Sequence, residues 1–184
     1  MVDKGLNRIF WGFFFILVNI NINNFDMVPD IAGFIFFAFA FKDLEEYSTF
    51  FKEAFKYNGY LIIISALSIF NVQLSGDSIM TAKWLIMFAV FVVSLVLRLK
   101  MVYSLFMGLK EMHNSKFYGE LAAGAEERWQ KYKTLIILNL FTFVAAFIPL
   151  INIMYILALL VISIIYLVNT LRYINSCRDA YSGY

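Results

Sequence analysis

Long runs of apolar residues, separated by short polar or charged segments, are the main feature of the sequence. A helix needs about 20 residues to cross the roughly 30 Å of hydrocarbon in a bilayer. On this basis we predict six membrane-spanning helices, several of them short. They are residues 9–22, 29–41, 60–72 and 81–97, and two helices within residues 134–170.

The last apolar run, residues 134–170, contains no charged residue in 37 positions. As one helix it would be about 55 Å long, almost twice the hydrocarbon thickness. Pro149 and Asn152 lie near its middle, where a turn forms most easily. We therefore predict two helices joined by a tight hairpin.

The three longer segments between the apolar runs also allow structural predictions. In residues 42–57, apolar side chains recur every three or four positions with charges between them, which predicts an amphipathic helix. Residues 101–112 repeat this pattern, so we expect the fourth helix to continue beyond the membrane surface. Residues 114–133 are predicted to form the longest loop.

Composition agrees with this assignment. Of the 184 residues, 62% are hydrophobic and only 15% are charged, whereas soluble domains are about half apolar and a quarter charged. A chain of this size cannot bury so much apolar surface in water. The sequence therefore predicts one all-α membrane domain, residues 1–184, built as a bundle of about six helices with amphipathic cytoplasmic extensions.

The basic residues predict the orientation of the bundle. With the N-terminus inside, every Lys and Arg except Lys83 falls on the cytoplasmic side, as the positive-inside rule requires for short loops. The first apolar run ends in asparagines with no small-residue cleavage site, so we interpret it as an uncleaved span. We expect a multi-pass cell-membrane protein with both termini in the cytoplasm.

The outer loop between the first two spans offers one candidate ligand site. Asn19, Asn21, Asp26 and Asp30 carry oxygen atoms that could bind a cation or a polar headgroup. The simpler alternative is that the two carboxylates serve the start of the second span, where capping and the helix dipole favour them. The sequence leaves both interpretations open.

Three further polar residues are candidates for contacts within the membrane or at its surface. Arg98 and Lys100 end the fourth span, and Asn139 lies in the fifth. A charge inside a bundle suggests a functional site, but long basic side chains near a helix end can also reach the headgroups. Asn139 could instead form a hydrogen bond to a neighbouring helix.

The sequence argues against several kinds of catalysis. Cys177 is the only cysteine and His113 the only histidine, so an internal disulfide, a cysteine-rich metal site and a two-histidine zinc site are excluded. Glu126 and Glu127 resemble the paired glutamates of CAAX-type membrane proteases, but Lys131 replaces the arginine of that motif. We expect no catalytic residue, no metal, no cofactor and no nucleic-acid partner.

A short motif around Asp26, Pro29, Asp30 and Gly33 gives the chain its one resemblance. The segment FDMVPDIAGFI, residues 25–35, resembles a pattern in small multispanning membrane proteins of low-GC Gram-positive bacteria, most of them uncharacterised. The likeness covers about the first third of the chain. It implies a bacterial cytoplasmic membrane and no particular activity.

Two classes of function remain open from the sequence. The first is a non-enzymatic membrane protein: a small transporter, or a membrane subunit or partner of a larger complex, with a protein partner or a second copy beside it. The size and span count are similar to those of the substrate-binding subunits of energy-coupling-factor vitamin transporters, but residues 9–22 lack the small-residue coupling motif of that family. The alternative is a membrane-embedded enzyme that acts on lipid or a lipid-linked substrate.

Overall fold

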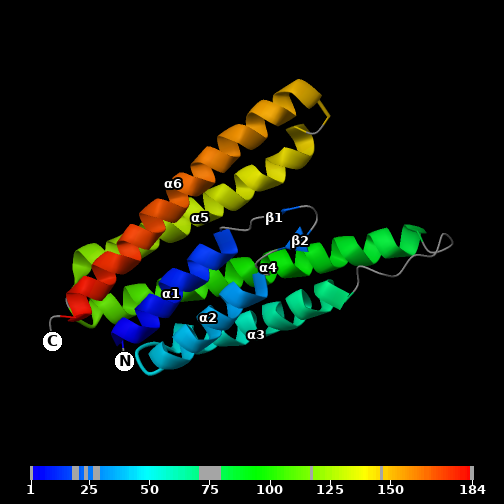
Figure 1. The fold of residues 1–184 in the computed structure, drawn as a ribbon. Helices are drawn as coiled ribbons and strands as arrows, with labels where there is room; N and C mark the ends of the chain where they lie inside the picture. Colours follow the sequence, from blue (N-terminus) through cyan, green and yellow to red (C-terminus); the bar gives the residue numbers. More distant parts are fainter. Residues whose placement is uncertain are drawn as a thin grey trace.

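The computed structural model describes residues 2–17, 21–22, 25–26, 30–70, 80–116, 118–145 and 147–182. In these ranges the chain forms six helices, which confirms the all-α class (Figure 1). The helices are α1 (Val2–Leu17), α2 (Asp30–Leu44), α3 (Thr49–Phe70), α4 (Met80–Asn114), α5 (Gly119–Ala145) and α6 (Pro149–Ser182). Between α1 and α2, the two-residue strands β1 (Asn21–Ile22) and β2 (Phe25–Asp26) pair antiparallel.

The six helices form a closed ring. Each helix packs against the next one in the chain, and α1 also packs against α6. Figure 1 shows the helices gathered at the end of the molecule where both termini lie, which we call the closed end. Toward the opposite end, the open end, the α5–α6 pair diverges from the α3–α4 pair, and the shorter α1–α2 pair lies between them (Figure 1).

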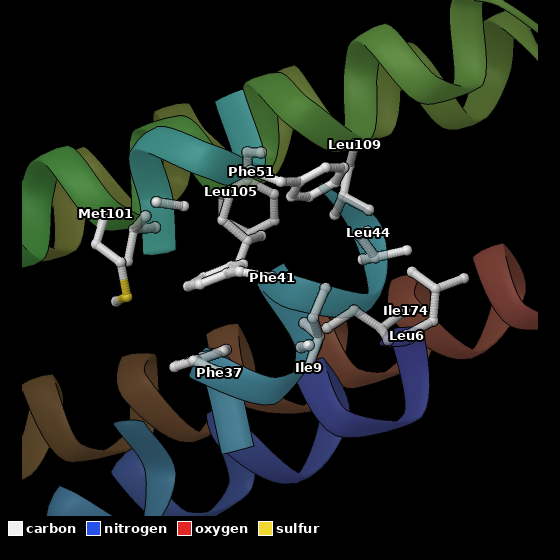
Figure 2. Close-up of a cluster of buried hydrophobic side chains, with 14 of the residues drawn as sticks. Leu6, Ile9, Phe37, Phe41, Leu44, Phe51, Met101, Leu105, Leu109 and Ile174 are labelled. Atoms are coloured by element: carbon white, nitrogen blue, oxygen red, sulfur yellow. The ribbon is translucent and has the colours of Figure 1, made fainter. Parts of the chain in front are cut away.

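The hydrophobic core lies toward the closed end. Side chains at three- and four-residue steps point inward from several helices, such as Leu6 and Ile9 on α1 and Met101, Leu105 and Leu109 on α4, all at most 2% exposed. Figure 2 shows this cluster, in which α1, α2, α3, α4 and α6 all contribute side chains. The four residues predicted to share one apolar face, Val102, Leu105, Phe106 and Leu109, are all buried, but most other residues of the segment 101–112 are buried as well.

The open end instead carries exposed apolar side chains, such as Leu85 at 67% and Met154 at 68% exposure. Two of the described helices are both long and apolar enough to cross a membrane, within residues Leu85–Asn114 of α4 and Ile151–Tyr181 of α6. Exposed apolar surface of this extent is typical of a lipid-facing region. These two helices give weak support to a membrane location.

The first two predicted spans differ from the structure. Helix α1 begins at Val2 and ends at Leu17, so it starts before the predicted residues 9–22, which run into β1. With 16 and 15 residues, α1 and α2 are only about 24 Å and 22 Å long, less than the hydrocarbon thickness.

The predicted amphipathic helix over residues 42–57 is divided in the structure. Residues 42–44 end α2, residues 45–47 form a turn, and α3 starts at Thr49. Ser48 sets this start, because its hydroxyl accepts a hydrogen bond from the backbone N–H of Phe50 at 3.1 Å, as an N-cap residue does. Helix α3 therefore begins well before the predicted residues 60–72.

The loop predicted for residues 114–133 is wrong, because α5 begins at Gly119 and runs through that segment. Alanine and glutamate give the segment high helix propensity. Lys131 and Glu127, four positions apart, also form an ion pair at 2.5 Å. Glu127, Lys131 and Lys133 lie on the exposed surface of this helix.

Two other expectations about helix ends are confirmed. Helix α4 continues to Asn114, beyond its apolar run. The apolar stretch 134–170 is divided into two helices, since α5 ends at Ala145 and α6 begins at Pro149. Proline suits this first helical position because its missing N–H has no partner there to lose.

Candidate functional site: a cavity beside Arg98

A cavity of about 940 Å³ lies between the α1–α2 pair, α4 and α5, with one residue of α6 at its wall. It lies on the side where the helix pairs diverge. Most of the lining is aliphatic or aromatic. These apolar residues are Phe13, Ile16, Phe34, Phe37, Phe91, Leu95, Met101, Val102, Leu135, Ile136, Leu140 and Phe143.

The same cavity has a polar part. Its polar lining residues come from α4, α5 and α6, and they are Ser94, Arg98, Tyr132, Asn139, Thr142 and Ser163. Arg98 carries the one formal charge among the lining residues that the structure describes. An apolar pocket with a few polar groups that converge on it is the usual form of a small-molecule site.

Arg98 is half-buried on α4, and its guanidinium carbon lies 5.5 Å from the ring centroid of Phe34 on α2. A guanidinium at this distance from an aromatic face is attracted by the ring electrons. The contact holds the positive charge against the wall that α2 contributes to the cavity.

Lys100, the neighbouring candidate from the sequence, takes a different position. Its ammonium nitrogen lies 5.5 Å from the ring centroid of Tyr57 on α3, and it does not line the cavity. Two positions correspond to about 200° around a helix, so these basic residues project from different sides of α4. The structure thus separates Arg98, at the cavity, from Lys100, outside it.

Asn139 also lines the cavity, from α5. Its Nδ2 donates a hydrogen bond to the backbone oxygen of Leu135, one turn earlier in the same helix, at 2.9 Å. This bond fixes the amide on the wall of the cavity from within α5. The sequence suggested a hydrogen bond from Asn139 to a neighbouring helix, but this nitrogen forms its bond within α5.

The outer-loop candidates are only partly described by the structure. Asn21 in β1 lies opposite Asp26 in β2 in the backbone register, and Asp30 is the first residue of α2. An anion at that position is favoured by the helix dipole. Asp26 precedes the helix by four positions, which is too far for a capping residue. Asn19 lies outside the described residues, and a ligand site formed by the four side chains stays a prediction.

A buried polar cluster at the closed end was not predicted. Nε2 of His113 on α4 lies 3.2 Å from Sγ of Cys177 on α6, and Nδ1 of His113 lies 3.2 Å from the hydroxyl of Tyr181. His113 and Cys177 are both fully buried. Because they are 64 positions apart in the sequence, no local motif could have paired them.

The His113–Cys177 pair is unsuited to nucleophilic catalysis. Burial lowers the pKa of His113 to about 4 and raises the pKa of the Cys177 thiol to about 12. Both side chains are therefore neutral at physiological pH, whereas a catalytic cysteine needs its thiolate and an open path to substrate. The pair serves as a link between α4 and α6.

Ion pairs connect neighbouring helices around the closed end. Arg8 of α1 forms an ion pair with Asp43 of α2 at 2.5 Å. Lys110 of α4 forms another with Glu126 of α5 at 3.0 Å. The hydrogen bond from Lys110 also lowers the pKa of Glu126. This pairing gives Glu126 a structural role at the contact between α4 and α5.

Comparison with protein-family models, with curated proteins and with solved structures finds no match to this chain. Within the described residues, no group of three or more His, Cys, Asp and Glu side chains could hold a metal ion. The functional proposal therefore depends on the cavity and its lining.

Proposed function

We propose that this chain is a non-enzymatic multi-pass membrane protein that binds an amphiphilic ligand in the cavity beside Arg98. It acts as a small transporter, or as the ligand-binding membrane subunit of a larger complex. The observation that carries the proposal is the cavity of about 940 Å³, whose described lining is mostly apolar and includes the cationic side chain of Arg98. This volume is within the range of small-molecule sites, roughly 300–1,000 Å³.

The proposed arrangement in the membrane follows from the two ends of the bundle. The exposed apolar side chains of the open end face lipid, and the charged closed end lies in the cytoplasm. In this arrangement α3, α4, α5 and α6 cross the bilayer, and the shorter α1 and α2 enter it part way. Because the helices come in pairs, both termini lie on the same side whether or not the α1–α2 pair reaches the far surface.

The kind of cell is a separate part of the proposal. A bacterial cytoplasmic membrane is supported only by the resemblance around Asp26, Pro29, Asp30 and Gly33. The cavity itself requires a membrane but no particular organism.

The lining of the cavity favours binding over catalysis. The guanidinium of Arg98 has hydrogen-bond donors and no acceptor, so it suits the binding of a polar or anionic group better than acid–base chemistry. The serine, threonine and asparagine side chains of the described lining can donate or accept hydrogen bonds. Such a set recognises a polar group. The described lining holds no histidine or carboxylate, the commonest acid–base groups, and its phenol is that of Tyr132.

Filling the cavity tests the proposal. Ser94 lines it, whereas the preceding residue, Val93, is 50% exposed and outside the lining. Native mass spectrometry of the purified full chain should detect a co-purifying amphiphile in the wild type and in Val93→Trp. The same ligand should be lost from Ser94→Trp. A wild type that retains no amphiphile, or equal retention by both variants, would contradict the proposal.

A further inference from the structure

We propose that the outer surface of α3, α4 and α5 binds the headgroups of anionic phospholipids through Lys56, Lys100 and Lys133, which we call the lysine belt. The proposal rests on the membrane arrangement proposed above, but it does not require a ligand in the cavity. It adds the kind of lipid that contacts this side of the bundle at the cytoplasmic surface of the membrane.

The three lysines lie on neighbouring helices, because α4 packs against both α3 and α5. The ammonium nitrogen of Lys100 lies 5.5 Å from the ring centroid of Tyr57, which is the residue next to Lys56. Lys56 on α3 and Lys100 on α4 therefore lie close to one level along the bundle.

Two aromatic rings give the level of the third lysine. The ring centroids of Tyr103 on α4 and Trp129 on α5 are 5.2 Å apart, so these residues lie side by side. Lys100 lies three positions from Tyr103 toward the open end, and Lys133 lies four positions from Trp129 in the same direction (Figure 1). These steps correspond to rises of about 4.5 Å and about 6 Å, so Lys100 and Lys133 also lie close to one level.

The lysine belt is accessible from outside the bundle. All three lysines are exposed, and within the part of the chain that the structure describes none of them forms an ion pair. Glu126 interacts electrostatically with Lys133, but its ion-pair partner is Lys110, at 3.0 Å. The ammonium groups of the belt can therefore bind an anion outside the chain.

Each lysine of the belt has an exposed apolar side chain one helical turn nearer the open end. Tyr60 is 47% exposed, Val96 44% and Ile137 48%, and each lies four positions from the lysine of its helix. Positions four apart lie on the same face of a helix. The surface thus presents a cation and then apolar side chains, in the order in which a phospholipid presents its headgroup and its hydrocarbon chains.

The charges of the three helices are sorted on either side of the belt. Toward the open end, residues 57–70, 84–97 and 134–145 carry no charge, and Arg98, beside the second of these segments, lines the cavity. The carboxylates of α3, α4 and α5 all lie toward the closed end, and they are Glu53, Glu111, Glu120, Glu126 and Glu127. Positive charge next to the apolar surface favours anionic headgroups over zwitterionic ones.

The test compares two phospholipids that have the same acyl chains. The purified full chain, in an uncharged detergent, is titrated with dioleoyl phosphatidylglycerol, which is anionic, or with dioleoyl phosphatidylcholine, which is zwitterionic. Native mass spectrometry gives the affinity for each lipid. We expect the anionic lipid to bind roughly tenfold to a hundredfold more tightly, because each lysine near an anionic headgroup contributes about fivefold. Equal affinities in the wild type would overturn the proposal, whatever the variants do.

A triple variant assigns the preference to the lysine belt. It combines Lys56→Gln, Lys100→Gln and Lys133→Gln, and it should bind the two lipids with nearly equal affinity. The loss should come from weaker binding of phosphatidylglycerol, while the affinity for phosphatidylcholine stays the same. A triple variant that keeps the full preference would overturn the proposal.

A matched control removes the same number of charges from the same three helices, nearer the closed end. It combines Lys52→Gln, Lys110→Gln and Lys131→Gln, and it should keep most of the preference for phosphatidylglycerol. In the wild type, Lys110 and Lys131 are paired with Glu126 and Glu127. An equal loss of preference in both triple variants would overturn the proposal, because net charge alone would then explain the binding.

A cavity-filling variant separates the lysine belt from the cavity. Ser94→Trp should keep the preference for phosphatidylglycerol, since the three lysines are not part of the described cavity lining. Loss of the preference in Ser94→Trp would assign the lipid to the cavity and overturn the proposal. If the wild type binds neither lipid, the proposed membrane arrangement fails as well, whereas equal binding of both lipids overturns only the lysine belt.

Discussion

The thiol of Cys177 and the imidazole of His113 meet at 3.2 Å between Sγ and Nε2, across the interior of the helix ring. Cys177 belongs to α6 and His113 to α4. Within the part of the chain that the structure describes, these two helices are not neighbours in the ring. Both side chains are fully buried. The contact therefore fixes the closed end of the bundle and leaves the other end, where the cavity lies, to the diverging helix pairs.

We expect Cys177 to resist alkylation in the folded protein. Burial excludes reagents, and a thiol with its pKa raised to about 12 has almost no reactive thiolate at neutral pH. Mass spectrometry after maleimide treatment should find Cys177 labelled only when the protein is denatured. Ser115→Cys, at an exposed position, is the control that should label in the native state. Equally fast labelling at both sites would contradict the burial of Cys177.

Acidification should destabilise the protein through His113. Its pKa falls from 6.5 in the unfolded chain to about 4 in the folded protein because burial disfavours the charged form. The folded state then binds fewer protons than the unfolded state, so stability is complete above pH 6.5 and declines as the pH falls to about 4. The maximum loss is about 3 kcal/mol.

His113→Gln tests this dependence, because glutamine stays neutral throughout. Melting temperatures between pH 7 and pH 4 should fall less in the variant than in the wild type. The pKa values of Glu126 and Glu127 are lowered by their lysine and arginine partners. These carboxylates titrate in both proteins, so their effect on the melting temperature cancels when the variant is compared with the wild type. Parallel melting curves for the two proteins would exclude His113 as the cause.

The close approach of α1 and α2 should make Gly33 intolerant of a side chain. A Cβ atom there would collide with Ile16 and lie 3.0 Å from the backbone oxygen of Gly12. Small residues at such contacts allow membrane helices to pack closely, and overpacking costs about 1–3 kcal/mol. Gly33→Ala should lower the melting temperature.

Gly59 provides the matched control for this substitution. It lies within α3, and no atom lies within 4 Å of a Cβ added there. Gly59→Ala should be neutral or stabilising by up to about 1 kcal/mol, because alanine favours a helix. If both alanine variants melt like the wild type, the contact between α1 and α2 is looser than described.

The proposed orientation can be tested with single cysteines. Phe147, in the turn between α5 and α6, is 86% exposed, and Ser115 is exposed at the end of α4. An impermeant thiol reagent added to intact cells should label Phe147→Cys and leave Ser115→Cys unlabelled until the membrane is permeabilised. Labelling of Ser115→Cys from outside would reverse the topology.

The sequence was informative where a single chemical property decides the structure. The absence of charge in residues 134–170, with Pro149 in the middle, predicted the α5–α6 hairpin correctly. Helix length was harder to predict, because hydropathy alone does not show that α1 begins among charged residues and ends at Leu17. Residues 119–133 form a helix because alanine and glutamate favour one, a local preference that the positions of apolar runs do not show.

The cavity was predictable only in part. Arg98 and Asn139 were singled out because polar residues in apolar runs are unusual, and both line the cavity. Their shared location could not be predicted, since an apolar run indicates how deep a residue lies but not which way it faces around the helix. For the same reason the sequence could not distinguish Arg98 from Lys100.

Ring closure by α1 and α6 has a consequence for biogenesis. Arg178 of α6 donates a hydrogen bond at 3.0 Å to Asp3 of α1 across 175 positions, so this junction cannot form until α6 has left the ribosome. In the proposed membrane arrangement, the short α1–α2 hairpin lacks the length to anchor itself across a bilayer, and it would dock against longer helices that are translated after it. On that proposal, the wall that this hairpin gives to the cavity is assembled late, and a nascent chain that stops before α6 would lack the completed cavity.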